Sequence, residues 1–301
     1  MPNFLIVGAP KSGTSSLYNY LNQHPQVAMS RVKEPHFFTF ENKEIDFQGT
    51  GDLHRLRKVV TRLEDYEKLF EGVSNEVAIG EASTTYLESA YACDRIKHHI
   101  PEAKLIAILR NPVETAYASF LHLVRDGDET ITDFGLALKE EEKRIQQNWG
   151  KLWHYKHRGF YYVQVKQYFD NFHPEQLKIY RYEDFKNDPN KVLKDIFQFL
   201  GVDDTFTADM SARYNVSGMP KNPLINRLIL KSNPLKTAIK LVVPETSRRR
   251  LSQKIKDWNF NNFQRKPEMK LEVRQQLVED YQEDILKLQD LIQQDLSNWL
   301  K

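Results

Sequence analysis

A short glycine-containing segment near the start of the chain could bind an anion. Residues 8–16 read GAPKSGTSS, follow a continuous apolar run at 4–8 and precede a helical pattern at 17–21. In such a strand–loop–helix unit, backbone N–H groups and the helix N-terminus together attract a negatively charged group. The Lys11 ammonium adds a point charge to this loop. The alternative interpretation is an ordinary turn before a helix N-cap.

This loop differs from the phosphate-binding loop of nucleoside triphosphatases. That loop reads G-x-x-x-x-G-K-[ST], with its lysine directly after the second glycine and a hydroxyl that holds magnesium. Here Gly13 is followed by Thr14, and Lys11 stands two residues before Gly13. No clear acidic strand end of the metal-holding kind accompanies the loop. The spacing therefore favours chemistry without a metal ion over phosphoryl transfer.

A second strand-to-helix junction later in the chain carries another anion-binding pattern. Residues 104–110 read KLIAILR, which predicts a buried strand that ends in Arg110. Asn111 and Pro112 then begin a helix that we expect to run to about residue 125. Ser119 falls within this helix. Because a guanidinium binds phosphate oxygens in a bidentate manner, Arg110 is a candidate for a second phosphate contact.

Taken in order, the two patterns resemble those of the sulfotransferases that use 3'-phosphoadenosine-5'-phosphosulfate (PAPS). Residues 159–161, 182–185 and 295–299 are similar to later landmarks of that family, so the resemblance extends over essentially the whole chain. It implies PAPS as the donor, 3'-phosphoadenosine-5'-phosphate (PAP) as the product and no metal ion. It also implies a set of donor-binding residues: Lys11, Ser12, Gly13, Thr14, Ser15, Ser16, Arg110, Ser119, Tyr182, Ser217 and Lys221.

The resemblance gives each part of this set a role. Residues 10–14 match the loop that binds the 5'-phosphosulfate, and Arg110 with Ser119 matches the pair that grips the 3'-phosphate. Tyr182 resembles the tyrosine that contacts the adenine. Residues 215–221, which include Ser217 and Lys221, are a looser match to the loop that closes over the 3'-phosphate.

Sulfuryl transfer is an in-line displacement that needs a cation on the bridging oxygen, a base for the acceptor proton and a fixed donor. Lys11 is the candidate cation. Glu34, in the KEPHFF segment at 33–38, resembles the base of the glycosaminoglycan branch, and we expect burial among aromatic residues to raise its pKa. His36 and His122 are the rival bases, because imidazole accepts protons near neutral pH.

One departure from the family pattern concerns the acceptor. Ala82, in GEASTTY at 80–86, stands where the heparan-type enzymes carry a lysine. This departure counts against a highly anionic glycan and favours a small hydroxylated or phenolic acceptor. Lipid-like and glycan acceptors stay open, because acceptor pockets are built from variable loops such as residues 39–57.

The remaining apolar patterns predict the elements that position these residues. Strands are expected at 27–30, 76–81 and 177–182, and helices at 61–70, 189–200 and 271–300. Strands that alternate with helices predict an α/β fold with a central parallel sheet flanked by helices. We expect one P-loop-like domain over residues 1–301.

Composition limits the setting of this chemistry. The 43 basic and 41 acidic residues leave a formal charge of +2, which does not indicate a nucleic-acid partner. Cys93 is the only cysteine, so an intramolecular disulfide is excluded. No apolar run approaches the roughly 20 residues that span a bilayer, and we expect a cytoplasmic protein. The oligomeric state cannot be predicted.

Three interpretations of function follow. The first is a PAPS-dependent sulfotransferase, the second a small-molecule kinase that needs magnesium, and the third a non-catalytic module that binds PAP. A basic stretch at 221–256, with ten basic residues against Glu245, is consistent with a lid over an anionic donor, an acceptor dock, a membrane-surface contact or a solvated face.

Overall fold

The computed structural model describes residues 1–211, 219–220, 263–264 and 267–301. Ser217, Lys221 and the basic stretch at 221–256 lie outside the described residues. Within the described part of the chain, no helix is long and apolar enough to cross a membrane.

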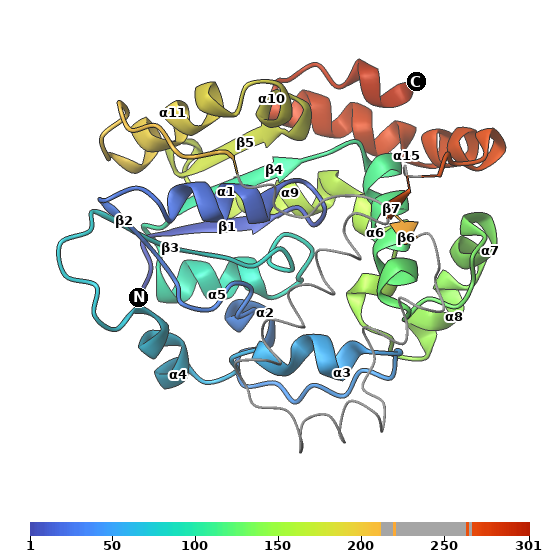
Figure 1. Ribbon diagram of the computed structural model, residues 1–301, viewed down its shortest axis with the longest axis horizontal. Coiled ribbons are helices and arrows are strands. Elements are labelled where there is room, and N and C mark those ends of the chain that lie inside the picture. Colours follow the sequence, from blue (N-terminus) through green and yellow to red (C-terminus); the bar gives the residue numbers. More distant parts are fainter. Residues whose placement is uncertain (212–218, 221–262, 265–266) are drawn as a thin grey trace.

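The centre of the fold is a five-stranded parallel sheet (Figure 1). Its strands are β1 (Phe4–Gly8), β2 (Val27–Met29), β3 (Ala78–Ala82), β4 (Lys104–Leu109) and β5 (Leu177–Arg181), in the order β2-β3-β1-β4-β5. Strand β1 is central, with Phe4 opposite Gly80 of β3 and opposite Lys104 of β4. Because all pairs are parallel, the carboxyl ends of the strands meet at one edge. The predicted central parallel sheet is confirmed.

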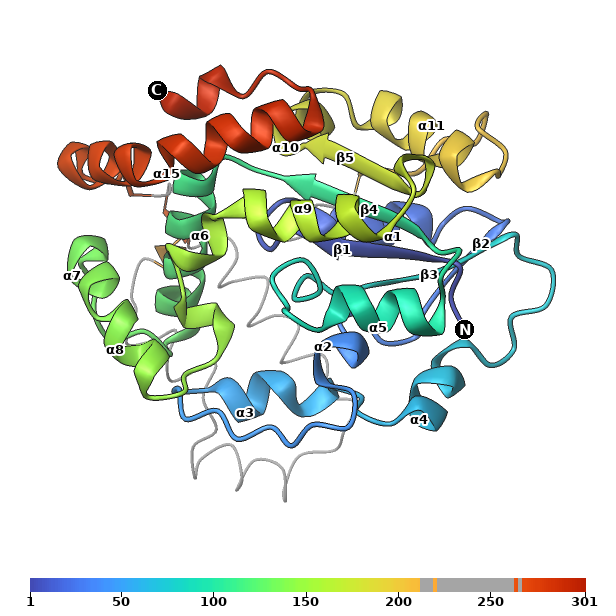
Figure 2. The ribbon, with the colours of Figure 1, turned by 180° about the vertical axis from the view of Figure 1, so that it is seen from behind.

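Alternating residues of β1 enter the two halves of the core, as the two-residue period of a strand requires. Phe4 and Ile6 pack on the face covered by α1 (Thr14–Leu21) and α11 (Pro189–Leu200), which lie in front of the sheet in Figure 1. Leu5 and Val7 pack on the opposite face with α5 (Ala92–His99), α9 (Tyr161–Asn171) and α15 (Leu271–Ile292). Figure 2 shows α5 and α9 across that face.

The other helices surround the sheet and its carboxyl edge. They are α2 (Phe37–Phe40), α3 (Asp52–Arg55), α4 (Leu63–Glu67), α6 (Pro112–Asp126), α7 (Phe134–Lys139), α8 (Glu141–Gln146) and α10 (Tyr182–Asn187). Short 3-10 helices span Leu56–Lys58, Lys68–Phe70, Lys151–Trp153, His157–Gly159, Pro174–Gln176 and Ser297–Leu300. Strands β6 (Met219–Pro220) and β7 (Phe263–Gln264) form a separate antiparallel pair. Helices α6, α7 and α8 lie beyond the carboxyl ends of the strands (Figures 1 and 2).

Helix boundaries follow local capping chemistry. Asn111 caps α6 by accepting from the backbone N–H of Val113, and Gly127 ends that helix in the left-handed region at φ 73°. The helix expected at 271–300 ends earlier, at Ile292, because Gln293 has φ 52° and breaks the helical path. The helix expected at 61–70 is divided between α4 and the following 3-10 turn.

Candidate active site

A cavity of about 1770 Å³ borders the loop after β1. Its wall includes most of the predicted site residues: Lys11, Gly13, Thr14, Ser15, Ser16, Glu34, His36, Arg110, His122 and Tyr182. Ser12 and Ser119 do not line it. Both are buried, and each donates its hydroxyl proton to a backbone carbonyl, Ser12 to Pro10 at 3.3 Å and Ser119 to Thr115 at 2.9 Å.

The loop after β1 depends on one glycine. Gly13 precedes α1 with φ 87°, a conformation that L side chains rarely adopt. A Cβ built on Gly13 would lie 3.2 Å from Cδ1 of Phe185 and 3.3 Å from Cε2 of Tyr182. The glycine therefore allows both the turn and the close approach of α10 to the loop.

A hydrogen bond joins the two predicted anion-binding motifs. Nη1 of Arg110 donates to the carbonyl oxygen of Lys11 at 3.2 Å. The guanidinium of Arg110 also lies over the ring of Tyr182, 4.9 Å from its centroid. The residue at the end of β4 thus supports the loop after β1 and stacks on the aromatic side chain predicted to contact the adenine.

The Lys11 ammonium lies in a crowded electrostatic environment. Burial is the main cause that lowers its pKa to about 8, and the nearby Arg125 guanidinium acts in the same direction. The carboxylates of Asp126 and Glu34 act in the opposite direction. Lys11 is therefore a cation that can lose its charge at mildly alkaline pH before an anionic ligand binds.

Glu34 occupies a strained turn at the cavity wall. Its backbone has φ 60°, and its side chain is 37% exposed. Burial of the carboxyl acts to raise its pKa, but Lys33, with Nζ 2.7 Å from Oε1, and His36 outweigh this effect and lower the pKa to about 2. The expectation that burial raises the pKa of Glu34 is wrong. The reason is Lys33, whose ammonium pairs with the Glu34 carboxylate and stabilises its ionised form.

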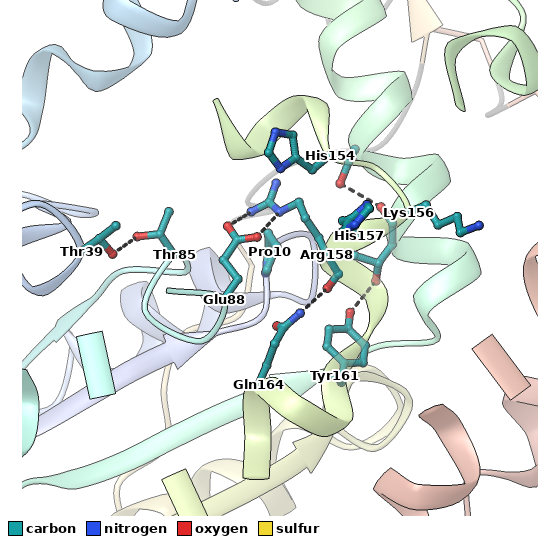
Figure 3. Close-up of polar contacts among 12 residues, drawn as sticks. Pro10, Thr39, Thr85, Glu88, His154, Lys156, His157, Arg158, Tyr161 and Gln164 are labelled. Atoms are coloured by element: carbon teal, nitrogen blue, oxygen red, sulfur yellow. Dashed lines mark hydrogen bonds and ion pairs between the residues drawn. The ribbon is translucent and has the colours of Figure 1, made fainter. Parts of the chain in front are cut away.

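His36 is buried beside Glu34. Its Nε2 lies 3.6 Å from Oε2 of Glu34, and its Nδ1 lies 2.9 Å from Oγ1 of Thr85. Figure 3 shows the further contact of Thr85 Oγ1 with Thr39 Oγ1, at 2.8 Å. Burial lowers the pKa of His36 to about 4. The imidazole is therefore neutral near pH 7.

His122 faces two guanidinium groups. Its Nδ1 lies 2.6 Å from Nη2 of Arg125, and its Nε2 lies 3.3 Å from Nη1 of Arg55. Burial and the Lys11 charge hold the pKa of His122 well below its usual range. A neutral imidazole has one acceptor nitrogen. Because an arginine already approaches each ring nitrogen, this geometry counts against His122 as the base.

Residues 43–60, which form one wall of the cavity, are held by hydrogen bonds and an ion pair at several points. The backbone N–H of Asn42 donates to Thr61 O at 2.9 Å, and that of Val60 donates to Pro35 O at 2.9 Å, so the ends of the segment meet. Farther along, Arg55 pairs with Asp128 at 2.6 Å, beyond the end of α6. This closed segment carries most of the lining residues on the side away from the loop after β1.

Sequence reasoning missed two charged residues of the cavity wall. Nε and Nη2 of Arg158 donate to the two carboxylate oxygens of Glu88, each at 3.0 Å. Figure 3 shows the third guanidinium nitrogen pointing away from Glu88. This Nη1 is buried without a hydrogen-bond partner among the described residues. The available signal was position, because Arg158 directly precedes the landmark at 159–161.

Comparison with known proteins identifies the family. Residues 2–206 match the Sulfotransferase family. The chain belongs to the sulfotransferase family. The crystal structure of a sulfotransferase from Alicyclobacillus acidocaldarius shares 34% identity with it at a TM-score of 0.79, over 100% of this chain and 99% of that one.

This sulfotransferase is also similar to parts of two longer proteins with established names. Carbohydrate sulfotransferase 15 of Mus musculus is 29% identical over 254 residues, which cover 67% of this chain and 44% of the relative. The bifunctional heparan sulfate N-deacetylase/N-sulfotransferase 4 of Mus musculus is 29% identical over 210 residues, covering 67% of this chain and 22% of the relative. The chain thus spans less than half the length of these two relatives. In the described part of the sulfotransferase, no group of three or more His, Cys, Asp or Glu side chains could hold a metal ion.

Proposed function

We propose that the chain transfers the sulfuryl group of PAPS to an acceptor hydroxyl or amine by in-line displacement. The observation that carries this proposal is the 3.2 Å hydrogen bond from Arg110 to the Lys11 carbonyl. It joins the phosphosulfate loop to the predicted 3'-phosphate residue on the wall of the cavity that Glu34 also lines. Membership of the sulfotransferase family supports the same reaction.

The donor would lie along the loop after β1. Backbone N–H groups and the hydroxyls of Thr14, Ser15 and Ser16 suit the 5'-phosphosulfate, since they stand at the N-terminus of α1. Arg110 suits the 3'-phosphate, and Tyr182 suits the adenine face. Because Ser119 bonds to its own helix and lies off the cavity wall, Arg110 carries more of the proposed 3'-phosphate contact.

The reaction breaks the bond between sulfur and the bridging oxygen. The acceptor oxygen or nitrogen forms a new bond to sulfur, and the electron pair of the broken bond stays on the phosphate oxygen of PAP. A cation beside that oxygen stabilises the developing charge. Lys11 fits this role, since its ammonium is a compact point charge on the loop itself.

The acceptor proton would pass to the Glu34–His36 pair. Glu34 is the more exposed of the two side chains, and its pKa of about 2 keeps it ionised. So low a pKa makes the carboxylate a weak base, so it would take the proton late, once the new bond to sulfur has made that proton strongly acidic. Neutral His36 lies behind it, where its Nε2 faces Oε2 of Glu34 at 3.6 Å. The proton would therefore go to Glu34, with His36 supporting the carboxylate.

The chemistry of the cavity wall supports a hydroxyl-rich acceptor. Away from the loop after β1, the lining mixes apolar side chains such as Phe40, Phe47 and Leu56 with many polar and charged ones, among them Thr39, Lys43, Asp46, Thr50, His54, Arg57 and Lys58. Hydrogen-bonding groups of both kinds suit a polyhydroxylated molecule better than a lipid chain. Two relatives are named for carbohydrate and heparan sulfate chemistry, which agrees with a glycan acceptor.

Calorimetric titration with PAP in the absence of magnesium tests the donor site. We expect micromolar binding that Arg110→Ala weakens strongly. Transfer from radiolabelled PAPS to a panel of sugars, phenols and long-chain alcohols then tests the reaction and the acceptor class. PAP binding without transfer to any member would favour a non-catalytic module, and binding that requires magnesium would favour a kinase.

A further inference from the structure

A fully buried carboxyl group lies beneath the Glu34–His36 turn and has no role in the reaction described above. It belongs to Glu81, on β3, next to Ala82, whose carbonyl accepts from the Glu34 backbone N–H at 3.0 Å. We propose that Glu81 is a positioning residue, whose carboxylate orients two hydroxyl groups so that they hold the backbone of the Glu34–His36 turn. This inference rests on the proposed function, because the turn carries the proposed base.

Three hydroxyl groups surround the Glu81 carboxylate. Ser83 Oγ donates to Oε2 at 2.9 Å, and Tyr66 Oη donates to Oε1 at 3.3 Å. The Tyr86 hydroxyl makes a third hydrogen bond to the same carboxyl. All four side chains are buried. The carboxylate is thus held by neutral hydroxyl donors.

Two of these hydroxyls also contact the turn or the start of α2, which directly follows it. Ser83 Oγ accepts from the backbone N–H of His36 at 2.9 Å, and Tyr86 Oη accepts from that of Phe38 at 3.4 Å. His36 itself has φ 54°, in the left-handed region that costs a residue other than glycine conformational energy. Such a backbone persists only where surrounding contacts hold it. The hydroxyls of Ser83 and Tyr86 supply two of those contacts.

The charge of Glu81 fixes the direction of every bond in this network. A hydroxyl has one proton to donate and lone pairs to accept with. When the carboxylate takes the Ser83 proton, the Ser83 lone pairs are left for the His36 N–H. A protonated Glu81 carries its own proton, which must be donated to a neighbouring hydroxyl. The hydroxyl that accepts this proton keeps a second lone pair for the turn, but its own proton loses the carboxylate oxygen and the hydroxyl reorients, which weakens its contact with the turn.

The Glu81 carboxyl can gain or lose its proton within the pH range of an enzyme assay. Burial raises the pKa of Glu81 to about 7, although the Tyr86, Ser83 and Tyr66 hydroxyls partly oppose this. The Glu34 carboxylate adds to the rise, and Tyr18 of α1 also faces the Glu81 charge. Glu34 and His36 have pKa values of about 2 and about 4, so they titrate at much lower pH.

The first test follows the turn without any acceptor. Amide hydrogen exchange of the peptide covering residues 34–40 is measured in the wild type, Glu81→Gln and Ser83→Ala. Both variants should exchange in this peptide at least about tenfold faster, while the β4 peptide is unchanged. Ser83→Ala removes one acceptor of the turn, and Glu81→Gln removes the carboxylate that orients both acceptor hydroxyls. Glu141→Gln is the matched control, because Glu141 is another buried carboxylate that holds backbone N–H groups, those of Lys156 at 2.8 Å and His157 at 2.9 Å, and it does not line the cavity.

The second test uses transfer from PAPS to whichever panel acceptor the wild type turns over. Glu81→Gln and Ser83→Ala should each lower kcat by roughly tenfold to a hundredfold, as small misplacements of reacting groups do, with PAP affinity unchanged within about threefold. The wild-type kcat/KM should fall below about pH 7, and this acid limb should disappear in Glu81→Gln. The double variant should lose little more than either single variant.

The outcomes separate the two proposals. An acid limb that persists in Glu81→Gln, or exchange at 34–40 equal to that of the wild type, overturns the positioning role. If Glu81→Gln does not fold, Ser83→Ala decides, because it keeps the carboxylate and removes the one hydroxyl that joins it to the His36 N–H. If the wild-type protein binds no PAP and transfers no sulfuryl group, the proposed function is contradicted instead. The hydrogen-exchange experiment would still test the positioning role of Glu81 in that case.

Discussion

Nη1 of Arg110 donates to the Lys11 carbonyl at 3.2 Å, so the end of β4 sets the position of the residue that faces the proposed leaving oxygen. This contact means that the two anion-binding motifs form one unit. Loss of the Arg110 side chain should therefore affect the Lys11 loop as well as the 3'-phosphate contact.

Lys11→Ala should abolish sulfuryl transfer and leave PAP binding largely intact. The ammonium is proposed to act on charge that develops only as the bridging bond breaks, and such interactions affect kcat more than ground-state affinity. Turnover with PAPS and calorimetry with PAP measure the two effects separately. Near-normal turnover in Lys11→Ala would remove Lys11 from the bridging oxygen.

The alkaline limb of the pH profile should report Lys11. Burial lowers its pKa to about 8, and only the protonated form is a cation, so kcat/KM should fall as pH rises above about 8. Bound PAPS is anionic and favours the charged lysine, which should move the corresponding limb of kcat to higher pH. Rates measured from about pH 6 to 10 check both limbs, with Lys11→Arg as the control that stays charged. A kcat/KM profile that is flat through pH 9 would count against this assignment.

Glu34→Gln should lower turnover by at least about a hundredfold, which is the usual range for a general base. The amide keeps the size of the side chain and cannot take a proton at neutral pH. His36→Gln is the comparison, since a supporting residue should lose less. Steady-state rates at saturating PAPS provide the measurement, and undiminished activity in Glu34→Gln would transfer the role to a histidine.

Stability should also depend on Glu81. Its folded pKa of about 7 is above the ordinary value of 4.5, so the folded state binds this proton more tightly than the unfolded chain. The stabilising contribution is fully present below pH 4.5 and is lost as pH rises through about 7. Between about pH 5.5 and 8.5 the wild type should lose about 2 kcal/mol more unfolding free energy than Glu81→Gln. Urea titrations at the two pH values measure the difference, and equal losses would refute the assigned shift.

The local sequence pattern was sufficient to predict the parallel sheet and the position of the loop after β1. The apolar run at 4–8 and the run ending in Leu109 each appear as buried strands, because a strand covered on both faces needs a continuous apolar sequence. The capping residues Asn111 and Gly201 mark the start of α6 and the end of α11, since each meets a local geometric need. These features depend on neighbours within a few residues.

Properties that depend on side-chain geometry in the folded chain could not be predicted from the sequence. The pKa of Glu34 is set by the balance of burial against the Lys33 charge, and that balance is visible only in the folded geometry. Glu81 reads as an ordinary strand residue until Tyr66 and Ser83 are seen around it. Ser119 matches the expected spacing, yet it is buried and donates to the Thr115 carbonyl of its own helix. Spacing along the chain does not report these three-dimensional relationships.

The neck formed by Asn42 with Thr61, and by Pro35 with Val60, has an evolutionary consequence. A segment whose ends are bonded to each other can be lengthened, shortened or exchanged without moving the strands that hold the donor. Closing a longer loop adds little entropy cost, about 0.6 kcal/mol for each doubling of its length. Residues 43–59 would therefore form a replaceable cassette, through which one ancestral donor site could acquire new acceptors while Val60 keeps its contact with Pro35 of the proposed catalytic turn.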